Sequence, residues 1–420
     1  MNRAGQLEIQ TTWGKLVEEP PLAWQVAADG EPALVDVGYR LEQGNRLGFQ
    51  LGAYDHSRVL VLDPTLNYGT YIGGRNRDLA HAVVVDAQGN AFVTGSTTST
   101  DFPASDGAFA QERGGGWDAY VSKLAPDGSS LLFSTYVGGD GTEVGYGLAL
   151  DAADNVILAG ATGSTDFPTT SGAYKSVYNG GEYDAFVLKL AAGGDSLLYS
   201  TYVGGKDKDL AYAVAQHDDG PVIAGLTESP SFPTSGTAFD GTHNGLGDVF
   251  VAQLSAGGNS LRYSTLAGGS GEDLGRRLAV TRGGDVVVTG HTTSANFPTT
   301  NGAFAPDLRG KQDAFVLKLD AGGRSLDYST YLGGKADDYG NGLALDRKGD
   351  PVVTGTTRSD DFPTTEGAYD PAYNGYDDAF VLKLTDGGQS LAWSTYLGGS
   401  EIDSGMVVEL DAAGNPIVAG

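Results

Sequence analysis

Short stretches in which hydrophobic and polar residues alternate recur along most of the chain, four in each repeating unit. In the unit that begins at Glu143, VGYGLALD (144–151) and VILAGAT (156–162) form a first pair, and DAFVLKLA (184–191) and LLYSTYV (197–203) form a second. All four are too short, and too rich in β-branched and aromatic residues, for helices. The turns within each pair carry Gly, Asn and Asp, as tight hairpins do. Each unit is therefore predicted to contain four antiparallel strands.

The unit repeats with a nearly constant period. Phe-Pro dipeptides recur every 65 residues and begin at Phe102, Phe167, Phe232, Phe297 and Phe362. Pairs of glycines recur every 64 to 66 residues and begin at Gly73, Gly138, Gly204, Gly268, Gly333 and Gly398. Four-stranded units repeated radially make a β-propeller, whereas solenoid repeats are usually shorter. We therefore predict an all-β propeller of four-stranded antiparallel blades, preceded by a small N-terminal β segment.

The joint between two blades has a constant pattern, as in LLYSTYVGGKDKD (197–209). The glycine pair is predicted to release the chain from the outer strand of one blade, with positive φ. Asp209 then begins the inner strand of the next blade. The polar segment around DFPTT, between the second and third strands, is expected at the same end of the blade as the glycine pair. This end, the loop face, would carry nearly all of the loop length, and we expect function there.

The repeats begin and stop inside a blade. LNYGTYI (66–72) reads as a fourth strand without a blade of its own, and IVAG (417–420) completes only a second strand. If these two ends shared a blade, its third strand would be absent, which leaves a gap of roughly 4.8 Å plus side chains. We therefore expect five complete blades, an incomplete sixth and a C-terminal continuation.

Composition and charge narrow the classes of partner. The formal charge is −27, from 53 acids and 26 bases, and a surface of this sign repels nucleic-acid phosphates and anionic membranes. The absence of cysteine excludes disulfides and thiolate metal sites. No apolar run reaches the roughly 18 residues of a membrane span. The N-terminus, MNRAGQLEIQ, lacks the apolar core of a signal peptide.

The pieces DFPTT, DAFVLKL and STYLGG resemble the bacterial seven-bladed β-propeller repeat family (SBBP) over about residues 63–420. Residues 1–62, with LAWQV and VLVLDPTL, resemble the end of a β-rich domain of unknown function that often precedes such repeats. The resemblance implies a chain divided at about residue 62, and a non-enzymatic domain of a large secreted or cell-surface protein. It also suggests seven blades in a complete propeller.

An acid recurs at the head of every predicted inner strand: Asp78, Glu143, Asp209, Asp273, Asp338 and Asp403. In a closed propeller the six carboxylates would surround the mouth of the central channel, where neighbouring like charges favour a bound cation such as calcium. In the other interpretation, each carboxylate accepts backbone N–H bonds in its own crossing loop. We favour this second interpretation because a feature of every repeat usually serves folding. No other cofactor is expected.

Two further sets of residues stand out. A second acid begins each third strand, away from the predicted axis, and is expected to serve the same turn role: Asp118, Asp184, Asp248, Asp313 and Asp378. The position three residues after the first acid varies instead, through His81, Tyr146, Tyr212, Arg276, Asn341 and Met406. Such variation beside the axis indicates either contact with a ligand or drift at a surface position. The neighbouring basic cluster of Arg276, Arg277 and Arg282 is expected to be solvated.

Together these observations favour a non-catalytic propeller that binds proteins or polysaccharides on its loop face, as a monomeric module of a larger chain. No nucleophile elbow, HExxH motif or phosphate loop occurs in the sequence, so no enzyme is expected. The alternative is a cation-dependent propeller hydrolase, a phosphohydrolase or glycosidase that uses the acidic loop face. A phosphohydrolase would need basic residues beside the acids, and only the Arg276 region offers them. An extracellular or cell-surface location follows from the resemblance alone.

Overall fold

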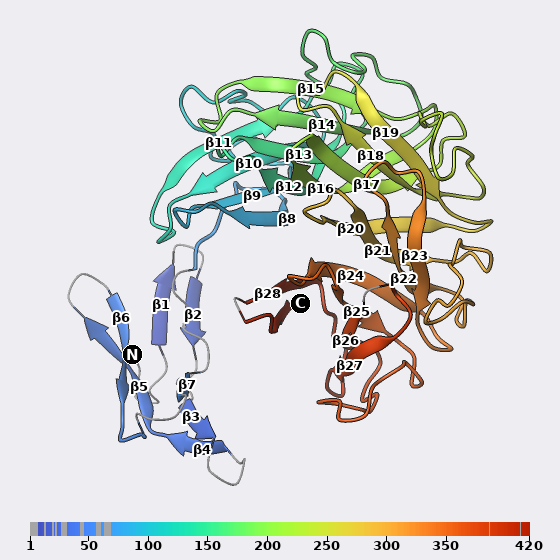
Figure 1. The fold of residues 1–420 in the computed structure, drawn as a ribbon. Coiled ribbons are helices and arrows are strands. Elements are labelled where there is room, and N and C mark those ends of the chain that lie inside the picture. The colour runs from blue at the N-terminus through green and yellow to red at the C-terminus, as the bar shows by residue number, and fades with distance from the viewer. Residues whose placement is uncertain are drawn as a thin grey trace. The chain divides into compact units, whose positions relative to one another are not determined.

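The computed structural model describes residues 7–11, 14–18, 21, 23–26, 32–42, 46–55, 60–62, 69–385, 387–411 and 413–420. The chain separates into two compact units, Met1–Thr70 and Tyr71–Gly420. Every regular element in these described ranges is a β-strand (Figure 1). The same ranges hold no helix of the length and apolarity needed to cross a membrane.

The first unit contains small antiparallel sheets. β1 (Leu7–Thr11) pairs with β2 (Gly14–Glu18), and β5 (Val37–Glu42) pairs with β6 (Arg46–Leu51). The central strand of a three-stranded sheet is β3, which lies between two neighbours: β3 (Ala23–Val26), β4 (Pro32–Val35) and β7 (Leu60–Leu62). The N-terminal β segment predicted from the sequence is therefore present in the described residues.

The second unit contains five four-stranded antiparallel sheets, each ordered from first to fourth strand. They are β8 (Asp78–Val85), β9 (Ala91–Thr97), β10 (Asp118–Leu124) and β11 (Leu131–Val137); β12 (Glu143–Leu150), β13 (Val156–Thr162), β14 (Asp184–Leu190) and β15 (Leu197–Val203); β16 (Asp209–His217), β17 (Gly220–Thr227), β18 (Asp248–Leu254) and β19 (Leu261–Ala267); β20 (Asp273–Val280), β21 (Val286–Thr292), β22 (Asp313–Leu319) and β23 (Leu326–Leu332); β24 (Asp338–Leu345), β25 (Pro351–Thr357), β26 (Asp378–Leu384) and β27 (Leu391–Leu397). A two-stranded sheet, β28 (Val407–Leu410) with β29 (Pro416–Ala419), follows. The predicted propeller blades are confirmed.

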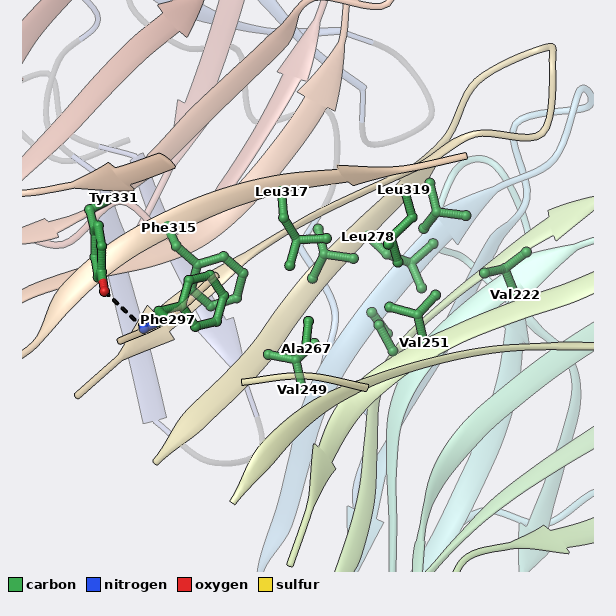
Figure 2. Close-up of a cluster of buried hydrophobic side chains, with 14 of the residues drawn as sticks. Val222, Val249, Val251, Ala267, Leu278, Phe297, Phe315, Leu317, Leu319 and Tyr331 are labelled. Carbon is green, nitrogen blue, oxygen red and sulfur yellow. Dashed lines mark hydrogen bonds between the residues drawn. The ribbon is translucent and has the colours of Figure 1, made fainter. Parts of the chain in front are cut away.

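Successive blades pack face to face through apolar side chains. Between the third and fourth blades, Val249 and Val251 of β18 are buried in one cluster with Phe315 and Leu317 of β22 (Figure 2). The alternation in each third strand produces this packing, because side chains on opposite faces of the strand enter different clusters. The apolar core is thus a series of layers between blades.

The described part of LNYGTYI, residues 69–72, is not a strand, although we expected one over 66–72. Residues 66–68 lie outside the described residues. A strand needs a partner for its backbone groups, and none of the described strands pairs with 69–72. Ile72 packs instead against the aromatic cluster of Phe102, Tyr120 and Tyr136. β29 is paired with β28 alone among the described strands.

The long segments between second and third strands do not stay on the loop face as expected. We call them the straps: residues 98–117, 163–183, 228–247, 293–312 and 358–377. In the second blade, the Thr170 N–H donates to the Ser200 carbonyl (3.1 Å) and the Lys175 N–H to Thr201 Oγ1 (2.8 Å), so the strap follows the free edge of β15. An unpaired edge strand exposes backbone donors and acceptors, and the strap satisfies them.

The straps also join neighbouring blades. The N–H of Tyr174 donates to the carbonyl of Gly258 in the next blade, at 3.2 Å. In the fourth blade, the Tyr331 hydroxyl of β23 donates to the Ser294 carbonyl (2.7 Å) and accepts from the Phe297 N–H at 3.1 Å (Figure 2). The aromatic residue and threonine of the repeated STY sequence therefore bind the strap to its blade.

Candidate functional site

Five of the six acids predicted to surround the channel begin inner strands, whereas Asp403 lies four residues before β28, and the acids face their own crossing loops. Asp209 accepts hydrogen bonds from the Gly205 N–H (2.6 Å), the Thr227 hydroxyl and the Ser229 hydroxyl (2.9 Å). The equivalent glycine, threonine and serine of the other blades donate to Glu143 in the second blade and to Asp78 in the first. Asp403 accepts the Gly399 N–H at 2.6 Å. This geometry supports the turn role that we favoured.

The threonine and serine donors follow each acid by 18 to 21 residues, in a Thr-x-Ser sequence at the end of the second strand. The donors are Thr97 and Ser99, Thr162 and Ser164, Thr227 and Ser229, Thr292 and Ser294, and, in the fifth blade, Ser359 of the Thr357–Ser359 motif. We did not recognise this motif in the sequence. Its nearly constant spacing from the acids is the signal that could have identified the partners.

The second set of acids lies beside the first, a neighbourhood that we did not predict from the sequence. At four joints, a Cβ added to the first glycine of the pair would meet both carboxylates. On Gly138 it would lie 2.6 Å from Glu143 Oε2 and 2.7 Å from Asp118 Cγ. Each second acid ends one strap by accepting its backbone N–H groups, as Asp118 does from Gly114 at 2.8 Å. At each of these joints, one pair of buried carboxylates therefore binds the strap, the crossing loop and the inner strand.

Burial changes the acidity of these pairs. It raises the pKa of Asp209 and of Asp338 to about 7, against the hydrogen bonds that lower it. The neighbouring carboxylate of Asp184 contributes to the raised pKa of Asp209. A protonated member of each pair relieves the repulsion between the carboxylates. Within the described residues, no group of three or more His, Asp or Glu side chains is placed to hold a metal ion.

The glycine pairs do not have the positive φ that we expected. None of the six pairs is among the glycines of the described residues with φ in that region. Their requirement is space: a Cβ on Gly205 would lie 2.5 Å from the Ser229 Cβ, below any normal contact. The pair allows the crossing loop to pass against the next blade's Thr-x-Ser segment.

The variable position of the inner strands is a β-bulge. In five strands the pairing register shifts across this residue, which is His81, Tyr146, Tyr212, Arg276 or Asn341. A bulge adds one residue without a ladder partner and redirects its side chain. Met406 occupies the aligned position before β28. The residue that varies between blades is therefore the one without a paired residue on the neighbouring strand.

Three bulged residues form an aromatic row. The His81 and Tyr146 rings have centroids 5.4 Å apart, and the Tyr146 and Tyr212 rings 4.9 Å apart. Burial raises the pKa of Tyr146 to about 12, so its hydroxyl stays protonated near neutral pH. Asn341 instead donates to the Gly405 carbonyl (3.1 Å) and Thr356 Oγ1 (3.2 Å).

The inner strands enclose a cavity of about 400 Å³, which we call the channel cavity. Residues of β8, β12, β16, β20, β24 and β28 line it, and these strands follow one another around it (Figure 1). His81, Tyr146 and Tyr212 are its aromatic lining residues, and Arg277 is the one arginine among the described lining residues. Glu409 is the one acid among the described lining residues.

Arg277 contradicts the expectation that the basic cluster is solvated. Arg282 is exposed in a hairpin, but Arg276 and Arg277 are half-buried. Burial, and then the charge of Arg276, lowers the pKa of Arg277. Arg277 occupies a position that holds Ala82, Gly147 and Ala213 in the preceding inner strands. That departure from small residues is the sequence signal that we missed.

Comparisons with known proteins agree with the fold. Residues 67–103 and 327–363 match the beta-propeller repeat family SBBP, and residues 1–65 match the domain of unknown function DUF7948. These matches confirm both predicted resemblances. No curated protein matches the sequence significantly.

Several solved structures resemble the chain at low sequence identity. The WD40 beta-propeller domain of Doa1 has 11% identity, covers 83% of this chain and 91% of its own, and has a TM-score of 0.34. A gluconolactonase from Xanthomonas campestris has 12% identity, 84% and 95% coverage, and a TM-score of 0.33. A quinohemoprotein alcohol dehydrogenase from Pseudomonas putida has 10% identity, 80% and 55% coverage, and a TM-score of 0.39.

Proposed function

We propose that this chain, which carries SBBP beta-propeller repeats, is a non-catalytic recognition module that binds a protein or a polysaccharide where the central channel opens beside the crossing loops. One observation carries the proposal. Side chains that differ from blade to blade are gathered at the bulged position of otherwise similar inner strands. A repeated scaffold whose side chains vary at one position beside the channel is typical of a recognition surface.

The composition of this position fits recognition. Tyrosine and arginine provide large contact area and directed hydrogen bonds, and they dominate the energetics of many binding sites. Tyr146, Tyr212 and Arg276 occupy three neighbouring blades. The row lies three residues from the buried acids that begin the inner strands, and therefore near the end that carries the crossing loops.

The repeated acids support binding more than hydrolysis. A hydrolase of the alternative kind would need carboxylates free to bind a cation or move a proton. The oxygens of Asp209 accept hydrogen bonds from three donors of its own blade and crossing loop. The arrangement therefore favours a scaffold role for these acids, as one module of a secreted or cell-surface protein.

The test compares the protein with a variant in the aromatic row, on glycan arrays and in pull-downs from envelope fractions. Tyr146→Asn with Tyr212→Asn removes the row and introduces the side chain that Asn341 already places at this position. Binding is expected to fall at least about tenfold, the cost of losing buried aromatic anchors. Tyr369→Ala, on a strap residue that is 87% exposed, is the matched control and should bind normally.

Three results would contradict the proposal. Silence of the unaltered protein in both assays removes the binding role. Turnover of phosphate esters or glycosides that is lost in Asp209→Ala, with folding retained, would establish the hydrolase instead. Equal binding by the double variant would move the binding surface away from the channel.

A further inference from the structure

Arg277 places a positive charge inside the channel cavity. It is the large exception at a position that is otherwise Ala82, Gly147, Ala213, Gly342 or Val407. Its strand, β20, has its bulge between Gly275 and Arg277, so Arg277 pairs with Thr289 directly after the bulged Arg276. One guanidinium contact is internal: Nη1 donates to the Arg276 carbonyl at 3.2 Å. The remaining donors of this planar fork are available to a ligand.

The charge is not neutralised within the part of the chain that the structure describes. None of the ion pairs found there includes Arg276 or Arg277. This is notable in a chain with 53 acids and 26 bases. His81 lines the same cavity, and burial and the charge of Arg277 lower its pKa. Glu409 lines the same cavity but forms no ion pair with either arginine. Two adjacent arginines without a carboxylate in ion-pair contact favour an anion supplied from outside.

The rest of the channel cavity is mainly apolar. Aliphatic residues of the inner strands line it: Leu148, Val214, Leu278, Leu343 and Val408. The aromatic row of His81, Tyr146 and Tyr212 forms another part of the wall. Small-ligand sites combine this kind of lining with a few polar groups that fix orientation, in volumes of about 300–1,000 Å³. A cavity of about 400 Å³ is within that range.

We propose that the channel cavity binds a small organic carboxylate with a flat apolar body. The carboxylate accepts hydrogen bonds from Arg277, and the ring of the ligand lies against Tyr146 and Tyr212. The guanidinium fork matches two carboxylate oxygens, and offset or edge contacts suit aromatic rings. This ligand class deepens the recognition role proposed above and rests on it, since the carboxylate would be a free metabolite or a group carried by the larger partner.

Phenylacetate is the probe, titrated by calorimetry into the whole chain. Benzyl alcohol lacks the charge, glucuronate lacks the apolar body, and phenyl phosphate changes the anion. Phenylacetate is expected to bind at least tenfold more tightly than benzyl alcohol and glucuronate. Binding should weaken with salt, because the contact is charged. Tighter binding of phenyl phosphate than of phenylacetate would overturn the choice of carboxylate.

The decisive variant is Arg277→Ala. Alanine occupies this position in two other blades, at Ala82 and Ala213, so the fold accommodates it. Phenylacetate affinity should fall at least tenfold in this variant. Arg277→Lys keeps the charge without the planar fork, so its affinity should lie between those of Arg277→Ala and the unaltered protein. Arg282→Ala removes an equal charge from an exposed hairpin and should bind like the unaltered protein.

The outcomes separate this inference from the recognition role. Equal phenylacetate binding by Arg277→Ala and the unaltered protein, with unchanged circular dichroism and melting, overturns the site. The absence of phenylacetate binding at millimolar concentration also overturns it. If glycan or protein binding persists in either case, the recognition role stands without this ligand; if that binding is absent too, both proposals fail.

Discussion

The carboxylates of Asp184 and Asp209, from the third strand of one blade and the first strand of the next, approach each other across Gly204. A Cβ on Gly204 would lie 2.7 Å from Asp209 Oδ2 and 3.1 Å from Asp184 Oδ1. Both acids are fully buried, and Asp184 Oδ1 has no hydrogen-bond partner among the described residues. Two buried like charges at a blade joint have consequences for stability that experiments can measure.

Stability is expected to depend on pH through these pairs. Burial raises the pKa of Asp209 to about 7, above the 3.8 of an ordinary aspartate. The folded state therefore holds the proton more tightly, and the stabilisation is fully present below about pH 4 and lost as the pH rises through 7. Urea unfolding between pH 5 and 8 should give a free energy of unfolding that decreases with pH.

Asp209→Asn should reduce that pH dependence, because the amide mimics the protonated acid and does not titrate. Asp195→Asn, at an exposed turn position, is the control and should leave the slope unchanged. A slope that is the same in all three proteins would show that the carboxylate pair does not link folding to protonation.

Gly204→Ala should destabilise the protein by about 1–3 kcal/mol, the usual cost of forcing a group into a packed site. The added methyl would meet two carboxylates that are fixed by their own hydrogen bonds. Gly236→Ala is the matched control, since a Cβ there meets nothing within 4 Å and φ is not positive. Chemical denaturation of the two variants checks the difference; equal stabilities would contradict the packing argument.

Leucine at the second position of the inner strand should contribute to the free energy of unfolding only where another blade covers it. Leu210 is 6% exposed and packs with Leu226 and Leu274, whereas Leu79 in the first blade is 48% exposed. Leu210→Ala should cost about 2–4 kcal/mol through lost burial and a cavity, and Leu79→Ala less than about 1 kcal/mol. Denaturant midpoints compare the two directly. Similar losses would mean that Leu79 is covered in solution.

Tyr331→Phe should loosen the strap of the fourth blade. It removes the hydrogen bonds of the hydroxyl to the Ser294 carbonyl and the Phe297 N–H, with an expected loss of about 1–2 kcal/mol. Faster proteolysis between residues 293 and 312 would locate the effect. Leu266 occupies the equivalent position of the third blade, so the fold tolerates the lost hydroxyl there. Unchanged stability and cleavage would contradict the role of the Tyr331 hydroxyl in binding the strap.

Calcium should leave the melting temperature unchanged. Donors already occupy both carboxylate oxygens of Asp209, and Asp338 Oδ2 accepts hydrogen bonds from the Gly334 N–H and the Ser359 hydroxyl. Thermal unfolding across millimolar calcium checks this expectation. A rise in melting temperature that disappears in Asp209→Asn with Asp338→Asn would restore calcium binding by these acids.

The local pattern of the sequence determined the blades. Alternation sets which face of a strand is apolar, and Gly, Asn and Asp set the hairpins, so strand order and pairing follow from neighbours along the chain. The constant period then makes the units equivalent. For the same reason, the acids at the strand starts could be recognised as repeated turn residues before their partners were known.

Contacts across blades required the tertiary structure. Asp184 and Asp209 meet only when successive blades pack, and the strap follows β15 only because that edge would otherwise be unpaired. The glycine pair was misread for positive φ because a sequence shows that a side chain is absent, and not what would collide with it. Arg277 became a candidate site residue only when six inner strands placed Tyr146 and Tyr212 around the same cavity. Sequence sets local geometry, whereas a cavity exists only once separate strands converge.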